Sequence, residues 1–427
     1  MGFRKATCIV IVISLFLFSC LSNAVFSLSD GWIEWNRMYR GTEVGSLVQT
    51  SDGGYAFCGK TNVTDPQGDF LLTKIDSLGN VEWNQTYSGI AYEQANAMII
   101  TSDDGYALAG PTSSFGNGLR DFWLVKTDKD GNIEWNQTYG ETGPEVPYSL
   151  VQTIDGGYAL VGVRHSISSD GSDCWMVKTD SEGNMEWSKT LSGRQVDSAF
   201  SVIETSDGDL VVLCKEYTQN ANYAFVSLTK MNSLGNIEWK QSYEGTFGNY
   251  CFSLIETSDG KIAFTCPNYL FDSGGGDFWL VKMSKEGNVE LNKTYGGSEK
   301  DVPYSLIETS DGGFALAGST ESFGHGNTDY WLVKTDPEGE MEWSRFYGEP
   351  EHEICYSLIQ ASDGGYLLAG NELIWDTHEE TIWLVKTNIQ GISEFPLQII
   401  LVVGLTIVLV LLIIYRNRFS GKKKWLK

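Results

Sequence analysis

The chain of 427 residues carries 30 Lys and Arg against 55 Asp and Glu, which gives a formal net charge of −25. So acidic a surface repels the phosphate backbone of nucleic acids and argues against DNA or RNA as a partner, whereas cations, cationic surfaces and neutral glycans stay open. Both ends depart from this balance, because residues 1–24 and 396–427 hold eight basic residues and no acidic one.

The first 24 residues predict a secretory signal peptide. Arg4 and Lys5 precede an apolar run that ends near Leu21, and Ser22-Asn23-Ala24 is a small-x-small cleavage pattern. We therefore expect the mature chain to be exported.

A nine-residue phrase recurs through the rest of the chain. It reads SDDGYALAG at 102–110, SDGGFALAG at 310–318 and SDGGYLLAG at 362–370. Its anchoring aspartates follow one another every 51 or 52 residues: Asp52, Asp103, Asp155, Asp207, Asp259, Asp311 and Asp363. Self-similarity at a fixed period is typical of repeat architectures, so the chain holds seven structural repeats.

Each copy contains four short runs of β-branched, aromatic and aliphatic residues, which predict strands A, B, C and D. In the sixth copy we expect them at Tyr304–Ser310, Phe314–Thr320, Tyr330–Thr335 and Met341–Tyr347. The Asp-Gly pair between A and B indicates a tight hairpin turn, because such turns need positive φ. No run has the length and 3.6-residue spacing of a helix.

Four strands per copy and a period near 50 predict an all-β fold, a seven-bladed β-propeller of four-stranded antiparallel blades over residues 31–395. The chain begins with a lone D-type strand at Ile33–Tyr39, and its last copy runs out after strand C at Trp383–Thr387. Pairing these segments closes the ring and removes a free edge. Gly391–Phe395, a degenerate D phrase, competes for that edge; the N-terminal strand matches the repeat better and is the one we expect there.

Residues 397–415 form a run of 19 without a charge, long enough to cross a bilayer as a helix. The tail at 416–427 is basic, and positive flanks stay on the cytoplasmic side. We therefore expect a single-pass membrane protein with its propeller outside the cell and its C-terminus in the cytoplasm.

Charged residues also recur inside the repeat, with a Lys in every strand C and a Glu at the start of every strand D. If Asp128 pairs with Asn132 across the C–D turn, Lys126 lies opposite Glu134. Opposite charges facing each other across two strands stabilise a sheet by roughly 0.2–1 kcal/mol. We interpret this series as scaffold rather than as chemistry.

Two covalent modifications are compatible with export. Cys251 and Cys266 fall on neighbouring strands of one copy, so a disulfide between them is one of the arrangements open. Four sequons are candidates for N-glycosylation: Asn62, Asn84, Asn136 and Asn292. Three of the four occupy one position of strand D, so they can equally be copies of a repeat phrase.

Two sets of residues are candidates for binding. The B–C loops differ between copies while the A–B turns are nearly uniform, and variable loops on a rigid scaffold often carry recognition. The loop candidates are Phe115, Arg120, His165, Phe323, His325 and Trp375. The second set opens strand A ten residues before the anchoring aspartates: Glu93, Glu145, Asp197, Asp301 and Glu353.

These five acids admit two interpretations. If strand A is the innermost strand, they surround the mouth of the central channel, where gathered like charges raise pKa values and favour a divalent cation such as calcium. Alternatively, each carboxylate accepts hydrogen bonds from the backbone of the D–A link in its own blade. Apart from such a cation, the sequence names no cofactor.

The phrase TDKDGNIEW at 127–135 resembles the tryptophan-docking motif of quinoprotein-like propellers, in which an Asp, a turn Gly and a Trp lock neighbouring blades. The whole repeat, over residues 31–395, is similar to the tandem propeller repeats of archaeal and bacterial surface proteins. The resemblance implies a propeller ectodomain with strand A innermost. It does not imply quinone dehydrogenase activity, because those enzymes typically have eight blades and often a vicinal Cys pair, which this chain lacks.

No catalytic set declares itself in the sequence. The four histidines show no metal-ligand spacing, and no Ser-His-Asp or Cys-His arrangement is recognisable. The predicted function is a non-catalytic, membrane-anchored binding or scaffolding module that recognises a glycan, a protein or another surface ligand. The alternative is an exported hydrolase, lyase or quinoprotein-like oxidoreductase that acts on cell-surface polymers.

Overall fold

A computed structural model describes residues 32–61, 68–165, 171–191, 197–217, 224–243, 253–269, 275–374 and 379–388. The chain divides into two compact units, one of Met1–Glu34 with Thr387–Lys427 and one of Trp35–Lys386. In the first unit the described residues are few, and the backbone N–H of Asn388 donates to the carbonyl of Trp32 at 3.1 Å. The second unit is the propeller.

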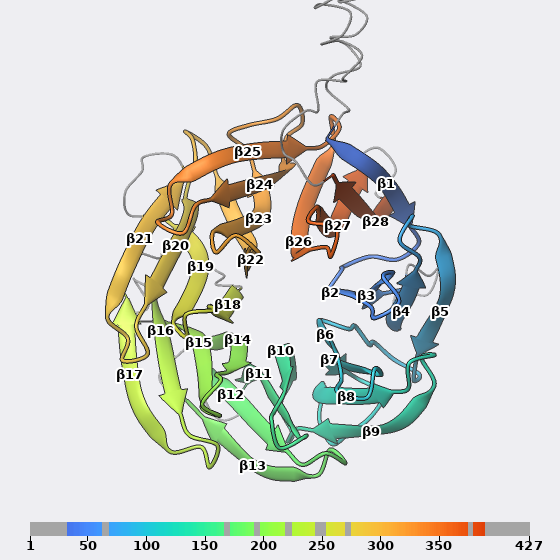
Figure 1. Cartoon of the computed structure of the whole chain (residues 1–427). Helices are drawn as coiled ribbons and strands as arrows, with labels where there is room; N and C mark the ends of the chain where they lie inside the picture. The colour runs from blue at the N-terminus through green and yellow to red at the C-terminus, as the bar shows by residue number, and fades with distance from the viewer. Residues whose placement is uncertain are drawn as a thin grey trace, which may run out of the picture. The chain divides into compact units, whose positions relative to one another are not determined.

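Seven four-stranded antiparallel sheets surround a common centre in this second unit, as predicted (Figure 1). In each blade the strands A, B, C and D lie side by side in that order. Strand A is innermost, and the seven A strands contact one another cyclically: β2, β6, β10, β14, β18, β22, β26 and again β2. The described propeller is therefore a closed ring.

The strands have the following bounds. Blade 1 holds β2 (Leu47–Gln49), β3 (Tyr55–Lys60), β4 (Phe70–Ile75) and β5 (Val81–Tyr87). Blade 2 holds β6 (Ala97–Ile100), β7 (Tyr106–Thr112), β8 (Asp121–Thr127) and β9 (Ile133–Tyr139), and blade 3 holds β10 (Glu145–Gln152), β11 (Tyr158–His165), β12 (Ser172–Thr179) and β13 (Met185–Thr190). Blade 4 holds β14 (Ser198–Glu204), β15 (Leu210–Tyr217), β16 (Ala224–Met231) and β17 (Ile237–Tyr243). Blade 5 holds β18 (Ser253–Glu256), β19 (Ile262–Asn268), β20 (Asp277–Met283) and β21 (Val289–Tyr295). Blade 6 holds β22 (Asp301–Glu308), β23 (Phe314–Thr320), β24 (Asp329–Thr335) and β25 (Met341–Tyr347), and blade 7 holds β26 (His352–Gln360), β27 (Tyr366–Ile374), β28 (Glu379–Thr387) and β1 (Ile33–Tyr39).

The N-terminal strand β1 completes blade 7 beside β28, which confirms the predicted closure. Strands B and D of blade 6 also have the expected bounds. Strand A of that blade spans Asp301–Glu308 instead of the predicted Tyr304–Ser310, because the A–B turn already begins at Thr309 and pairing extends N-terminally past a bulge.

The recurring aspartate organises the A–B turn. In blade 1 the Oδ1 of Asp52 accepts hydrogen bonds from the Thr50 hydroxyl at 2.6 Å and from the Gly54 N–H at 2.9 Å, while Gly53 takes a φ of 84°. Positive φ is the conformation for which glycine carries little penalty. The phrase SDGG is therefore a turn in which a side chain replaces backbone partners.

The strand C lysine forms the expected ion pair, but the predicted register is wrong by one residue. Lys126 faces Trp135, because Glu134 is the extra residue of a β-bulge that follows the Asp128–Asn132 pair. The bulge still places the Glu134 carboxylate 2.7 Å from the Lys126 Nζ. A second carboxylate, that of Asp103 in the A–B turn, lies 2.8 Å from the same Nζ.

Strand D docks each blade onto the next one. In β9 the Trp135 ring covers Gly183 in the C–D turn of blade 3, where a Cβ atom would lie only 2.6 Å from the ring. The Tyr139 hydroxyl donates to the Gly183 carbonyl at 2.6 Å. Tyr39, Tyr87, Tyr243 and Tyr295 make the same hydrogen bond to the next blade. The Trp-on-Gly contact agrees with the docking resemblance, and the Tyr hydrogen bond is a second lock that we did not predict.

Replacing Tyr139 with Phe should destabilise the propeller by about 1–1.5 kcal/mol, because the ring stays packed while the buried Gly183 carbonyl loses its donor. Urea unfolding followed by circular dichroism measures the change. Tyr87→Phe removes the same lock from the preceding interface and should cost a similar amount. A Tyr139→Phe variant as stable as the wild type would show that the hydrogen bond contributes nothing.

The predicted signal peptide and the predicted membrane span at 397–415 lie outside the described residues. Within the described part of the chain, no helix has the length and apolarity to span a membrane. Export and membrane anchoring therefore stay predictions from the sequence.

Candidate functional site

The central channel holds a cavity of about 330 Å³, and all seven blades contribute to it with residues in strand A or just before it. Serine hydroxyls of this inner ring accept hydrogen bonds from the A strand of the following blade, as from Met98 N–H to Ser46 at 3.1 Å and from Leu358 N–H to Ser305 at 3.2 Å. The last blade bonds to the first in the same way, because the Leu47 N–H donates to the Ser357 hydroxyl at 3.1 Å. These bonds fix the wall of the channel before any ligand arrives.

Aromatic residues at β-bulges line this cavity. The bulged strands and the extra residue of each bulge are β10 with Tyr148, β14 with Phe200, β22 with Tyr304 and β26 with Tyr356. A bulge re-aims the side chain of its extra residue, and all four of these side chains line the cavity. Tyr148 stacks on Phe200 at 5.3 Å between ring centroids, and Tyr304 meets Tyr356 edge-on at 5.0 Å.

Blades 1 and 2 break this aromatic wall. Gly45 and Asn96 occupy the repeat position that holds an aromatic residue in the other five copies. The channel wall is thus asymmetric, with aromatic rings along blades 3, 4, 6 and 7 and small or polar groups along blades 1 and 2. Phe252 of blade 5 occupies the aromatic position in sequence and lies outside the described residues.

The described lining of the cavity carries no charge. It consists of aromatic, aliphatic, methionine, serine, glycine and asparagine residues, with no Asp, Glu, His, Lys, Arg or Cys among them. This neutral, aromatic channel differs from the rest of a chain whose formal net charge is −25. It favours ligands that combine apolar faces with neutral polar groups.

All five predicted acids are buried. Glu145 and Asp301 begin strand A as expected, Asp197 and Glu353 lie within one residue of its start, and Glu93 lies four residues before β6. Three of them accept hydrogen bonds from the D–A link, as the second interpretation predicts: Gly89 N–H to Glu93 at 3.1 Å, Glu141 N–H to Glu145 at 3.4 Å and Gly297 N–H to Asp301 at 2.8 Å. Among the described residues, no group of three or more His, Cys, Asp or Glu side chains is arranged to hold a metal ion. Cation binding by these acids stays a prediction.

A second carboxyl approaches two of these acids from the preceding blade. A Cβ on Gly140 would lie 1.8 Å from Asp121 Oδ1 and 2.7 Å from Glu145 Oε2, so both carboxyl groups flank one glycine. Gly348 lies in the same way between Asp329 and Glu353. Burial, the larger cause, and the Asp of the preceding blade together raise the pKa of Glu145 to about 7 and that of Glu353 to about 8.

The loop candidates do not converge on one site within the described residues. Phe115 and Phe323 are each 40 % exposed and pack against a tryptophan of their own blade, at 5.1 Å in both cases. The Arg120 guanidinium lies 4.7 Å above the Tyr92 ring, and the His325 ring meets Phe346 at 5.5 Å. His165 is exposed at the end of β11. Trp375 lies outside the described residues.

The candidate modification sites are only partly visible. Asn84, Asn136 and Asn292 are exposed on strand D, and the latter two accept hydrogen bonds from Trp123 at 3.1 Å and Trp279 at 2.7 Å. The repeat phrase thus has a structural use at these positions, and glycosylation stays a prediction. Asn62 and Cys251 lie outside the described residues, so the Cys251–Cys266 pairing also stays open.

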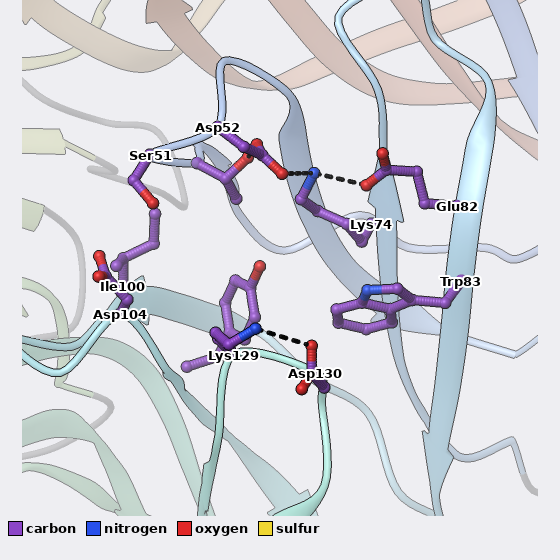
Figure 2. A pocket seen from close by; sticks show the side chains of 11 residues that line it. Ser51, Asp52, Lys74, Glu82, Trp83, Ile100, Asp104, Lys129 and Asp130 are labelled. Carbon is purple, nitrogen blue, oxygen red and sulfur yellow. Dashed lines mark hydrogen bonds and ion pairs between the residues drawn. The ribbon is translucent and has the colours of Figure 1, made fainter.

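A second cavity, of about 320 Å³, lies between blades 1 and 2 at the end of the ring that carries the A–B turns (Figure 2). Lys74 forms ion pairs with Asp52 at 2.9 Å and Glu82 at 2.8 Å on one side of it. The Trp83 indole forms another wall, and Asp104 lies across the opening.

Sequence reasoning missed the residues of both cavities. For the channel a signal was present, because the aromatic residue recurs in five of seven copies at one repeat position. This recurrence indicates a channel lining only if the β-bulge is known. In a regular strand the same side chain would point to another face of the sheet.

Comparisons with known proteins support the fold alone. No family model matches the chain, and no curated protein is similar in sequence. Among solved structures, a puromycin hydrolase superposes with a TM-score of 0.50 at 12% sequence identity, and the match covers 84% of this chain and 55% of that chain. The present chain therefore spans about half the length of that protein. Sqt1 from Chaetomium thermophilum superposes with a TM-score of 0.44 at 11% identity over 80% of this chain and 82% of that one. At sequence identities this low, the superpositions show a similar fold and say nothing about activity.

Proposed function

We propose that this protein is a non-catalytic binding module, anchored to the membrane at the cell surface, whose propeller holds a neutral glycan in the central channel. The observation that carries the proposal is the uncharged aromatic wall formed by the bulge residues of four blades. Sugars present aliphatic C–H faces that pack on aromatic rings and hydroxyl groups that bond to neutral polar side chains. The anchor and the location rest on the sequence.

The channel suits binding more than catalysis. General acid–base chemistry most often uses a His, Asp, Glu, Lys or Cys side chain within hydrogen-bond reach of the reacting atoms, and the described channel lining carries none of these, tyrosine hydroxyls being its only titratable groups. Glu145 and Glu353 have the raised pKa that is common among catalytic acids, yet both are buried and neither lines the cavity. An exported enzyme acting on surface polymers is the alternative, and it would need a site outside this channel.

The test is a glycan array probed with the full-length protein in a detergent that has no sugar head group. We expect binding to neutral oligosaccharides, with weaker binding to anionic ones. Tyr148→Ala and Tyr356→Ala should each weaken binding about tenfold or more, as is usual for a buried aromatic anchor. Phe346→Ala removes an aromatic residue that is 43 % exposed on the outer strand β25 and should leave binding unchanged.

Two outcomes would contradict the proposal. One is retention of wild-type affinity in both channel variants together with loss of affinity in Phe115→Ala, which would move the ligand to the B–C loops. The other is cleavage or oxidation of a glycan on incubation with the wild-type protein, which would favour the enzyme.

A further inference from the structure

A second ring of contacts links the A–B turns of neighbouring blades. In it, a backbone N–H of the turn donates to a Gln or Glu side chain of strand A in the next blade, as from Ser102 to Gln152 at 2.8 Å. The other contacts of this kind run from Ile154 to Glu204, Ser206 to Glu256, Ser258 to Glu308, Ser310 to Gln360 and Ser362 to Gln49. Six of the seven interfaces carry the contact, including the one that closes the ring.

The seventh interface, between blades 1 and 2, is different. Ile100 occupies the repeat position of the Gln or Glu, so it offers no acceptor to the Ser51 N–H. No hydrogen-bond acceptor for that N–H is found among the described residues. Ser51 and Ile100 both line the 320 Å³ cavity of Figure 2. The cavity therefore lies where the repeat is broken.

The same cavity holds a second departure from the repeat. Asp104 takes a φ of 64° at a turn position that is glycine in the other six copies. A non-glycine residue in this conformation is uncommon, and retained backbone strain often marks a functional position. The Asp104 side chain is exposed, and within the described part of the chain no cation or hydrogen-bond donor pairs with it. Its carboxylate is thus available to a ligand.

The groups around the cavity define a ligand chemistry. The Ser51 N–H can donate to an sp² oxygen of the kind that a Gln or Glu side chain supplies at the six other interfaces. At two of those interfaces the hydroxyl of the turn serine donates a second hydrogen bond to the same carboxylate, at 2.8 and 2.9 Å. The Asp104 carboxylate calls for a cationic amine. The Trp83 ring offers a face for an apolar or cationic segment.

We propose that the pocket between blades 1 and 2 binds a free amino acid with a carboxamide side chain, whose sp² oxygen replaces the missing side-chain acceptor on Ser51 and whose ammonium group pairs with Asp104. A neutral amide suits this place better than a second carboxylate, because Asp52 and Glu82 already offset the charge of Lys74, and Asp130 offsets that of Lys129. The site is separate from the central channel and does not depend on the function proposed for it.

Saturation-transfer NMR and calorimetry on the full-length protein test this site with L-glutamine as the probe. Acetamide carries the carbonyl without the ammonium group, and ethylamine carries the ammonium group without the carbonyl. We expect L-glutamine to bind at least tenfold more tightly than either half. L-Glutamate should bind more weakly than L-glutamine.

Substitutions separate ligand binding from scaffold effects. Ile100→Gln restores the repeat, so it should fill the acceptor position on Ser51, raise the thermal midpoint and lower L-glutamine affinity at least tenfold. Asp104→Gly relieves the positive φ and removes the carboxylate, so it should also raise the midpoint and lower the affinity. Gln360→Ile is the matched control, because it removes the same contact at the interface between blades 6 and 7, away from the pocket. It should lower the midpoint while L-glutamine affinity stays unchanged.

Undiminished binding of L-glutamine to Ile100→Gln, or no binding of L-glutamine to the wild-type protein, would overturn the proposal. Tyr148→Ala in the central channel should leave L-glutamine affinity unchanged. Failure of the glycan proposal and failure of this one can therefore be told apart.

Discussion

Replacing Glu353 with Gln is expected to raise the thermal midpoint of the propeller at pH 8 and to leave it unchanged at pH 4. The Glu353 side chain is 1 % exposed, and among the described residues neither of its carboxyl oxygens has a hydrogen-bond partner. Burial, the larger cause, and the neighbouring Asp329 carboxyl together raise its pKa to about 8. The folded protein therefore holds this proton more tightly than the unfolded chain, in which a glutamate titrates near pH 4.3.

The sign of the effect follows from proton linkage. A group whose pKa is raised on folding contributes its full stability below the unfolded pKa and loses it as the pH rises through the folded pKa. Between about pH 4 and 8 the wild type should therefore lose stability on the order of 4 kcal/mol from this group, while the neutral Gln loses none.

Thermal unfolding in EDTA over this pH range measures the effect, and Glu338→Gln, at an exposed position of a C–D turn, is the matched control. Equal midpoints for Glu353→Gln and wild type at pH 8 would show that the carboxyl is not held protonated. Repeating the series with calcium tests the predicted cation at the same time. A cation bound at Glu353 would raise the thermal midpoint of the wild type at pH 8 and leave that of the Gln variant unchanged.

Replacing Trp35 with Ala should destabilise the whole ring by about 3–5 kcal/mol, the usual cost of deleting a large buried aromatic side chain. Trp35 lies in β1, is 8 % exposed and donates from its indole N–H to the Ser77 carbonyl of blade 1 at 3.1 Å. Its ring also covers Gly79 in the first C–D turn. One side chain thus links the outer strand of blade 7 to blade 1.

Trp135→Ala provides the matched comparison, because Trp135 occupies the same repeat position in blade 2 and covers Gly183 in the same way. If β1 is an ordinary D strand, the two substitutions should cost similar free energies in urea unfolding. A Trp35→Ala variant within 1 kcal/mol of the wild type, beside a strongly destabilised Trp135→Ala, would mean that another segment completes blade 7.

The repeat made the blade number, the strand order and the closing strand predictable, because each depends on signals within one copy or on the chain ends. Contacts between different copies of the repeat were harder to predict from the sequence. Glu353 comes close to Asp329, 24 positions away, only when two blades lie side by side. In the same way, the lack of an acceptor for the Ser51 N–H depends on Ile100 of the next blade, 49 positions away. The A–B turn aspartate was predicted only as part of a hairpin turn. It also forms an ion pair with the buried strand C lysine, because strand B brings both residues to one end of the blade.

Hydrogen exchange with and without a neutral oligosaccharide selected on the array shows whether the central channel is the binding site. We predict that the ligand slows exchange in the inner strands β10, β22 and β26, which carry Tyr148, Tyr304 and Tyr356. The B–C loops that carry Phe115 and Phe323 should exchange as they do in the free protein. Protection confined to those loops, with unchanged exchange in the inner strands, would contradict the channel as the binding site.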